Sequence, residues 1–176
     1  MAAKNRKKEI GQEFEQEIID LARVTRVMAG GKRMRFRACV ALGNKKGKVA
    51  LGIAKGADVT LAINKAVAQA KKKFIEVPII NETIPHKILH KSGAAKVLLK
   101  PAPKGTGIIA GGVVRIILEL AGVSNAVSKI LGSKSKINNA LATIEALMGL
   151  KRIAEPAVKE KRETEKPAKA KLAKGG

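Results

Sequence analysis

The residue pattern with the most specific chemistry is Gly105-x-Gly107-x-x-Ala110, a spacing that can cradle the pyrophosphate of a dinucleotide. It lies between a predicted strand and a predicted helix, but it is not embedded in repeated parallel βαβ units. Asn125 stands twenty positions after Gly105, where a ribose needs an acidic partner, and no Gly-Lys-Ser/Thr of a phosphate-binding loop follows. The pattern therefore predicts a close-packed backbone turn, with nucleotide binding as the minor alternative.

The two histidines, His86 and His90, could ligate a metal ion, but no Cys, Asp or Glu stands between or beside them. Two ligands do not make a zinc site, and Pro85 argues against a helix that presents both. Residues 21–156 hold no recognisable set of nucleophile, base and orienting acid, and no paired-carboxylate site. The sequence predicts no metal, no cofactor and no enzymatic activity, and it gives the histidines a surface or RNA-contacting role.

Basic side chains are the largest chemical feature of the chain. It carries 36 Lys and Arg against 14 Asp and Glu, a formal net charge of +22, and residues 21–81 hold fourteen basic and two acidic residues. In one predicted strand, Arg33, Arg35 and Arg37 alternate with apolar residues, so one face presents three guanidinium groups with no carboxylate nearby in sequence. Such a surface attracts a polyanion, most commonly a nucleic acid. The predicted contacts are Arg23, Arg26, Gly30, Gly31, Lys32, Arg33, Arg35, Arg37, Lys45, Lys46, Lys48 and Lys55.

Aromatic content narrows the kind of nucleic acid. Single-stranded bases are usually held by stacking on aromatic rings, yet the chain has three Phe, no Trp and no Tyr. Contacts should therefore go mainly to phosphate and sugar. This favours a structured duplex or folded RNA that is read by its shape, with DNA wrapping as the competing possibility.

The basic residues must be positioned by a sheet that one helix covers. The sequence predicts a strand at 18–29, a tight turn at Gly30-Gly31, and a second strand in which Met34, Phe36 and Ala38 face the core. A turn at 43–47 leads to a third strand at 48–54. Asp58 is predicted to cap a helix whose apolar residues recur at helical spacing as far as residue 74.

Prolines at 78 and 85 mark a composition shift and a predicted domain boundary. Beyond it we expect strands at 83–89 and 96–100, a helix at 113–121, and a segment at 123–131 that fits strand or helix. A last helix at 137–150 should place Leu141, Ile144 and Leu147 on one face.

The single cysteine, Cys39, excludes an intramolecular disulfide and is predicted to be a small core residue, as expected in a reducing cytoplasm. The longest apolar run, at 108–114, is far shorter than the roughly 20 residues of a membrane span. The N-terminus has no apolar signal core. We therefore expect neither export nor a membrane partner.

Several segments match one known family. The strongest is residues 101–112, Pro-Ala-Pro-Lys-Gly-Thr-Gly-Ile-Ile-Ala-Gly-Gly, followed by Arg115 and by Ala-Gly-Val at 121–123. Supporting segments are Arg-Val-x-Arg-Val at 23–27, Gly-Lys-Val at 47–49 and Thr-Ile-Pro-His at 83–86. In this order and at matching separations, they make the chain similar, over about residues 18–150, to the bacterial-type small-subunit ribosomal protein S five family.

The resemblance implies an α+β fold. It would consist of a double-stranded-RNA-binding-like domain with a three-stranded sheet and one helix, then a small C-terminal β-α-β-α domain with a split βαβ arrangement. On this basis we expect a flexible arm at 1–16, the first domain at 17–80, the second at 81–155 and a disordered Lys/Ala/Pro-rich tail at 156–176.

The resemblance also implies a structural role in the cytoplasmic 30S ribosomal subunit, in its assembly and in decoding accuracy. The implied partners are 16S ribosomal RNA, the neighbouring proteins S four and S eight, and messenger RNA at the entry channel. The RNA-inserting hairpin would be the loop at 28–33, in the region where family members acquire spectinomycin resistance. The interface with protein S four would lie near Gly105, Thr106, Gly107, Gly111, Gly112 and Arg115.

Two other classes of function stay open at this point. One is a free-standing nucleoid or double-stranded-RNA-binding protein, which the basic tail would suit. The other is an enzyme that uses the glycine-rich loop for a nucleotide. Co-sedimentation with 30S particles in moderate salt would separate the ribosomal hypothesis from both.

Overall fold

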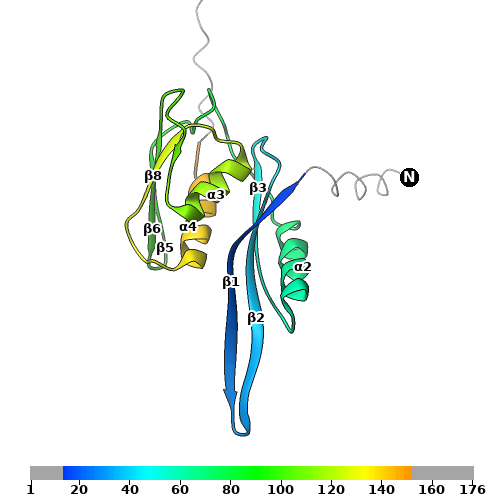
Figure 1. The fold of residues 1–176 in the computed structure, drawn as a ribbon. Helices are drawn as coiled ribbons and strands as arrows, with labels where there is room; N and C mark the ends of the chain where they lie inside the picture. The colour runs from blue at the N-terminus through cyan, green and yellow to red at the C-terminus, as the bar shows by residue number, and fades with distance from the viewer. Residues whose placement is uncertain (1–13, 152–176) are drawn as a thin grey trace, which may run out of the picture.

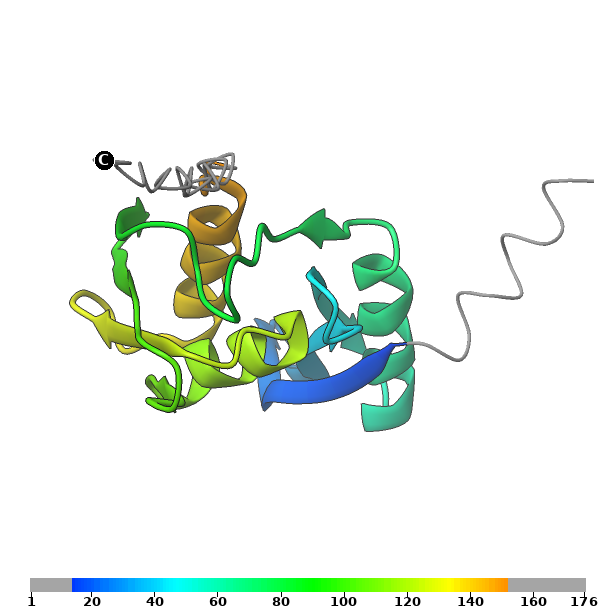
Figure 2. The same ribbon diagram turned by 90° about the horizontal axis from the view of Figure 1, so that it is seen from above.

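Figure 1 shows the computed structural model, which describes residues 14–151. Seen from above, the chain forms a helix, a sheet, a pair of helices and a second sheet, stacked in that order (Figure 2). The tail predicted at 156–176, and the predicted arm up to residue 13, lie outside the described residues.

The first sheet consists of β1 (Glu15–Met28), β2 (Gly31–Gly43), β3 (Lys48–Gly56) and β4 (Ile75–Glu76) in sequential antiparallel order. β1 begins earlier than predicted, because Glu15 and Gln16 pair with the end of β2 instead of belonging to an arm. A register shift between Ile18 and Asp20 turns Ile19 into the core.

The β1–β2 hairpin extends well beyond the rest of the sheet (Figure 1). Met28 pairs with Gly31, so the two turn residues are Ala29 and Gly30. The predicted Gly30-Gly31 turn is therefore displaced by one residue, since the strand register decides which residues are left to turn the chain. Gly31, with a φ of 139°, is the hairpin-tip glycine that adopts a positive φ.

Helix α2 (Val59–Ala70) covers one face of this sheet, and its predicted cap is confirmed. The Asp58 carboxylate accepts the Val59 N–H at 2.7 Å, and a hydrogen bond from Thr60 is the main cause of a lowered Asp58 pKa. Ala62, Ala66 and Ala70 form the buried side of the helix. The backbone of α2 lies so close to β3 that a Cβ on Gly52 would be 2.0 Å from the Ala66 carbonyl oxygen. This close approach leaves room only for small side chains between the helix and the sheet.

The second sheet has the strand order β5 (Ile88–Ser92), β6 (Ala95–Pro101), β8 (Ala126–Ile130), β7 (Ile108–Ile109). The segment at 123–131, ambiguous in sequence, contains strand β8, whereas the strand predicted at 83–89 begins only at Ile88. β7 and β8 are parallel direct neighbours, joined by α3 (Gly112–Ala121). No strand separates them, so the expected split of this βαβ unit is wrong, and the element order is β-β-β-α-β-α.

Helices α3 and α4 (Lys136–Met148) pack between the two sheets (Figure 2) and join them into one core. Cys39 and Ala41 of the first sheet meet Ile117 and Leu147 in this core. Leu141 is 38% exposed and Leu147 is fully buried, so the face predicted to hold Leu141, Ile144 and Leu147 is only partly buried. A spacing of three residues drifts around a helix, and α4 buries residues 139, 140, 142, 143, 146 and 147.

Candidate nucleic-acid interface

Strand register brings five of the predicted contacts onto one side of the first sheet. Arg26 pairs with Arg33, and Arg37 pairs with Lys55, and residues directly opposite each other share a face. Arg35 lies between them on β2. We call these five residues, Arg26, Arg33, Arg35, Arg37 and Lys55, the arginine face.

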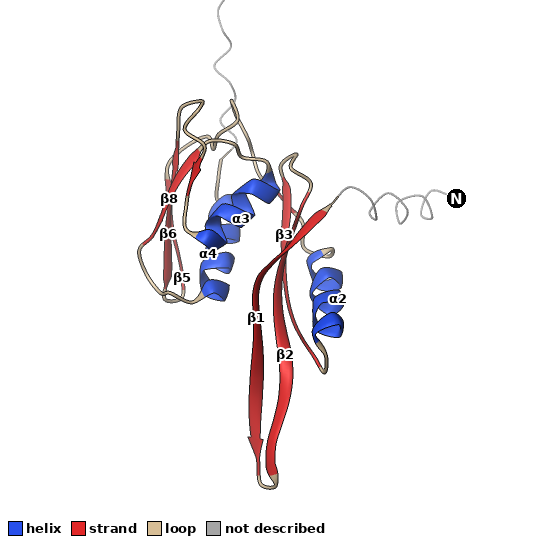
Figure 3. Cartoon of the chain, viewed as in Figure 1, coloured by secondary structure: helices blue, strands red, loops and turns tan. Residues whose placement is uncertain are grey.

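The arginine face continues a surface that is buried farther along β2. Cys39 and Ala41 lie on the same side of the strand, under α3 and α4, and are fully buried. The helices end before the hairpin does, which leaves Arg33 and Arg35 exposed (Figure 3). A hollow of about 310 Å³ opens here, lined by Val24, Thr25, Arg26, Met28, Arg33, Arg35 and Lys55.

One carboxylate that is distant in sequence lies beside the arginine face. Asp20 Oδ2 is 3.7 Å from Arg37 Nη2, and its other oxygen is 3.3 Å from Lys136 Nζ of α4. The register shift in β1 places Asp20 opposite Cys39, on the same side as Arg37. Arg37 is thus partly neutralised by a residue that is distant in sequence.

Two predicted contacts lie on the opposite side of the hairpin. Arg23 pairs with Phe36 and Lys32 pairs with Val27, on the side that faces α2 farther along. Met34, predicted to face the core, is 48% exposed there, because α2 does not reach the end of the hairpin (Figure 1). The hairpin therefore carries cations on both sides.

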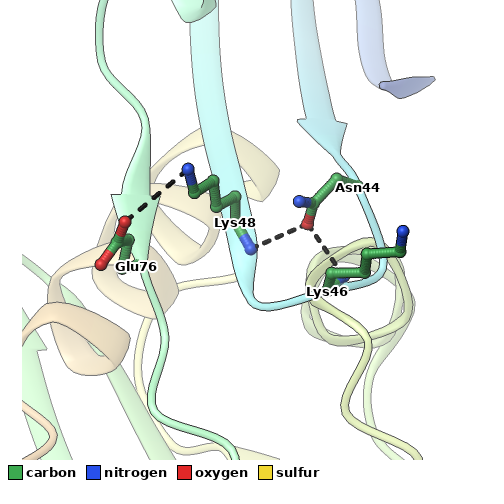
Figure 4. Close-up of polar contacts among 4 residues, drawn as sticks. All are labelled: Asn44, Lys46, Lys48 and Glu76. Carbon is green, nitrogen blue, oxygen red and sulfur yellow. Dashed lines mark hydrogen bonds and ion pairs between the residues drawn. The ribbon is translucent and has the colours of Figure 1, made fainter. Parts of the chain in front are cut away.

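The remaining basic contacts lie at the other end of the sheet. The β2 strand of 13 residues separates Lys32 from the turn that holds Lys45 and Lys46, about 40 Å at 3.3 Å per residue. Lys45 Nζ is 2.7 Å from Glu15, and Lys48 Nζ is 3.7 Å from Glu76 (Figure 4). The structure does not bring these lysines together with the arginine face.

This distant turn is rigidly built. Asn44 Oδ1 accepts the backbone N–H groups of Lys46 at 2.8 Å and Lys48 at 2.9 Å (Figure 4). The Lys45 N–H donates to the Leu120 carbonyl of α3 at 3.0 Å, and the Gly47 N–H donates to Ala121 at 2.8 Å. The turn thus joins the first sheet to α3 rather than standing free.

The glycine-rich loop is organised by Asn125. Its Oδ1 accepts the N–H groups of Gly105 and Gly107, both at 3.1 Å, and the Asn125 side chain is buried. Thr83 donates its hydroxyl to the Asn125 carbonyl and accepts the Ala102 N–H. Sequence reasoning considered Asn125 only as the absence of an acidic ribose ligand and missed this role. The sequence carries no signal for this role, because the burial of Asn125 is seen only in the structure.

Arg115 lies one turn into α3 and already has a partner. Its Nε is 2.9 Å from Glu119 Oε1, four residues along the helix, and both side chains are exposed. Gly105, Thr106, Gly111 and Gly112 of the same predicted interface are exposed too. Geometry leaves this loop accessible to a partner while its own backbone is held in place.

His90 and Cys39 interact with other residues of the protein itself. His90 Nε2 lies 3.1 Å from Glu145 Oε2, and hydrogen bonds from Ser92 and then from His90 lower the Glu145 pKa. Burial, aided by the charge of Asp20, raises the Cys39 pKa to about 11.

Within residues 14–151, His, Cys, Asp and Glu side chains form no group of three that could hold a metal ion. Over the same range, no helix is long and apolar enough to cross a membrane.

Comparison with known proteins identifies the family. The family model described as "Ribosomal protein S5, N-terminal domain" matches residues 14–78, and "Ribosomal protein S5, C-terminal domain" matches residues 90–162. The protein named "Small ribosomal subunit protein uS5" from Thermotoga neapolitana is 52% identical over 145 residues, 82% of this chain and 80% of that protein. The chain belongs to the ribosomal protein S5 family.

Other members of the S5 family give the same result. The protein of the same name from Acaryochloris marina is 45% identical over 163 residues, 92% of each chain. That from Synechococcus elongatus is 48% identical over 146 residues, 82% of this chain and 81% of that protein. The resemblance drawn from the sequence is confirmed, and because S5 proteins are structural, the chain is not an enzyme.

Proposed function

We propose that this S5 protein, a structural component of the small ribosomal subunit, binds 16S ribosomal RNA through the arginine face and the tip of the β1–β2 hairpin. The arginine face is the observation that carries the proposal. Arg26, Arg33, Arg35 and Lys55 have no carboxylate within ion-pair distance in the described part of the chain. Unpaired cations on a rigid strand suit phosphates.

The mode of binding follows from the shape of the hairpin. Two strands with cations on both sides can enter between segments of folded RNA, and no aromatic ring lies beyond Phe36 to stack on bases. With α2 behind its three main strands, the N-terminal unit would act as a double-stranded-RNA-binding-like domain that reads shape. In this account Lys45, Lys46 and Lys48 contact a separate segment of RNA more weakly than the arginine face does, because Lys45 and Lys48 are already paired with Glu15 and Glu76.

We also propose that the loop from Gly105 to Arg115 contacts the neighbouring protein S four, with S eight bound elsewhere and messenger RNA near the entry channel. Two properties of this loop support the proposal: it is exposed, and its backbone is held in a defined conformation. Gly105 and Gly107 hold φ values of 91° and 71°, and Asn125 fixes their backbone. A preorganised exposed loop loses little entropy when it binds.

The salt dependence of RNA binding tests the proposal. Each phosphate contact contributes about 0.7 to 0.9 to the slope of log affinity against log salt. The Arg33→Gln/Arg35→Gln variant should therefore reduce the slope for 16S RNA by about 1.4 to 1.8 in filter binding. Lys45→Gln/Lys48→Gln removes the same charge from the distant turn and should leave more of the slope intact.

Equal losses in the two variants would mean that net charge attracts the RNA without a defined site, and would reject the arginine face. Gradient sedimentation provides the second readout. Wild-type protein should migrate with 30S particles in moderate salt, whereas a free nucleoid protein would not.

A further inference from the structure

The second sheet has one face that the described helices and strands leave uncovered. Its inner face carries Val97, Leu99 and Ala126, which are fully buried under α3 and α4. The outer face, turned away from both helices, has no helix or strand of residues 14–151 over it (Figure 3). Antiparallel sheets commonly leave one face to solvent, and such a face then normally carries polar residues.

The charged side chains on this outer face are all positive. Lys91, Lys96, Lys100 and Lys129 are exposed, and strands β5 to β8 contain no Asp or Glu. Lys91 pairs directly with Lys96 across the sheet. Like charges in directly opposite positions destabilise a sheet, and no acid in these strands offsets them. This arrangement lacks the mixed charges of an ordinary solvated face.

Apolar side chains lie among these lysines. Leu89, 58% exposed, pairs with Leu98, and Ile109, 56% exposed, pairs with Val127. The register also puts Leu98 beside Lys129 and Val127 beside Lys100. Because residues paired across strands share a face, the outer face alternates apolar pairs with cations.

We infer that the outer face of the second sheet docks a partner protein whose contact surface is apolar at its centre and acidic around it. The lysines require carboxylates, and the leucines require apolar side chains, as in the apolar core and polar rim of protein interfaces. Phosphates of RNA would satisfy the lysines but would leave Leu89 and Ile109 uncovered. A protein is therefore favoured over RNA.

The inference rests on the proposed function in one respect, since the partner is taken to be another component of the small subunit.

A zero-length carbodiimide couples a lysine amine to a carboxylate only where the two are in direct contact. Treating intact 30S subunits with it should give mass-spectrometric cross-links from Lys91, Lys96, Lys100 or Lys129 to Asp or Glu of another protein. The exposed Lys71 and Lys72, which follow α2, are the matched control and should give at least fivefold fewer.

A photoreactive benzoylphenylalanine at Leu98 identifies the class of partner in the same particles, with Leu61 of α2, 50% exposed, as the control position. The expected product at residue 98 is sensitive to protease and resistant to nuclease, and K91E/K96E should lower its yield at least fivefold. A nuclease-sensitive product, or no product at residue 98, overturns the inference. If the protein also fails to enter 30S particles, the proposed function fails as well, so sedimentation distinguishes the two failures.

Discussion

Gly122→Ala should weaken the joint between the first sheet and α3. Gly122 ends α3 with a φ of 89°, and a Cβ there would lie 2.1 Å from the carbonyl oxygen of Lys45. The contacted atom belongs to backbone, so no side chain can move aside. The same turn donates N–H groups from Lys45 and Gly47 to the last residues of α3, and any separation strains both hydrogen bonds.

The expected cost has two parts. A left-handed conformation costs an L-residue about 1 to 2 kcal/mol. Loss of two hydrogen bonds adds about 0.5 to 1.5 kcal/mol each, so the free energy of unfolding should fall by roughly 2 to 5 kcal/mol. For a chain of this size, 1 kcal/mol corresponds to about 2 to 4 °C, which gives a decrease in Tm of roughly 4 to 20 °C.

Gly105→Ala is the matched control. Gly105 has a φ of 91°, but a Cβ there would meet no atom within 4 Å. This variant should lose only the left-handed cost of about 1 to 2 kcal/mol. Urea and thermal unfolding of both variants, followed by circular dichroism, measure the difference. Equal stability losses would refute the argument that close packing at the joint stabilises the protein.

Three further predictions concern individual polar contacts. Asp20→Asn should steepen the salt dependence of 16S RNA binding by freeing Arg37, and an unchanged filter-binding slope would contradict this. Glu145→Gln should lower stability at neutral pH but not in acid, because the lowered pKa of Glu145 stabilises the fold above its ordinary 4.5 and this contribution is lost as pH falls through the folded value. Urea titrations from about pH 3 to 7 test the sign, and a variant penalty that grows in acid would refute it. Asn125→Ala should speed hydrogen exchange of the Gly105 and Gly107 amides at least tenfold, and unchanged protection would show that Asn125 does not hold the loop.

Local patterns predicted several elements correctly. The Asp58 cap, the alternation along β2 and the helix that begins at Gly112 all depend on residues near one another in the chain. Family resemblance added the identity, because a run of specific residues at 101–112 carries information that composition and periodicity do not.

The errors in prediction share a different origin. The prediction of a turn at Gly30-Gly31 was wrong because pairing along the whole β1–β2 hairpin sets the register of the two strands. The strand expected at 83–89 failed because Thr83 instead bonds to Asn125 and Ala102, which are distant in sequence. The outer face of the second sheet went unnoticed because its lysines come from three separate strands.

Strand β2 shows most clearly how far the sequence alone can predict the structure. Its alternation reveals from sequence that residues 33, 35, 37, 39 and 41 share a face, because successive side chains of any strand point in opposite directions. The same pattern does not reveal that Cys39 is buried, that Arg37 meets Asp20, or that Arg33 stays exposed. Those outcomes depend on how far α3 and α4 extend along the strand, and on a register shift in β1. Contacts between distant segments thus divide one uniform face into a core and a candidate RNA-binding surface.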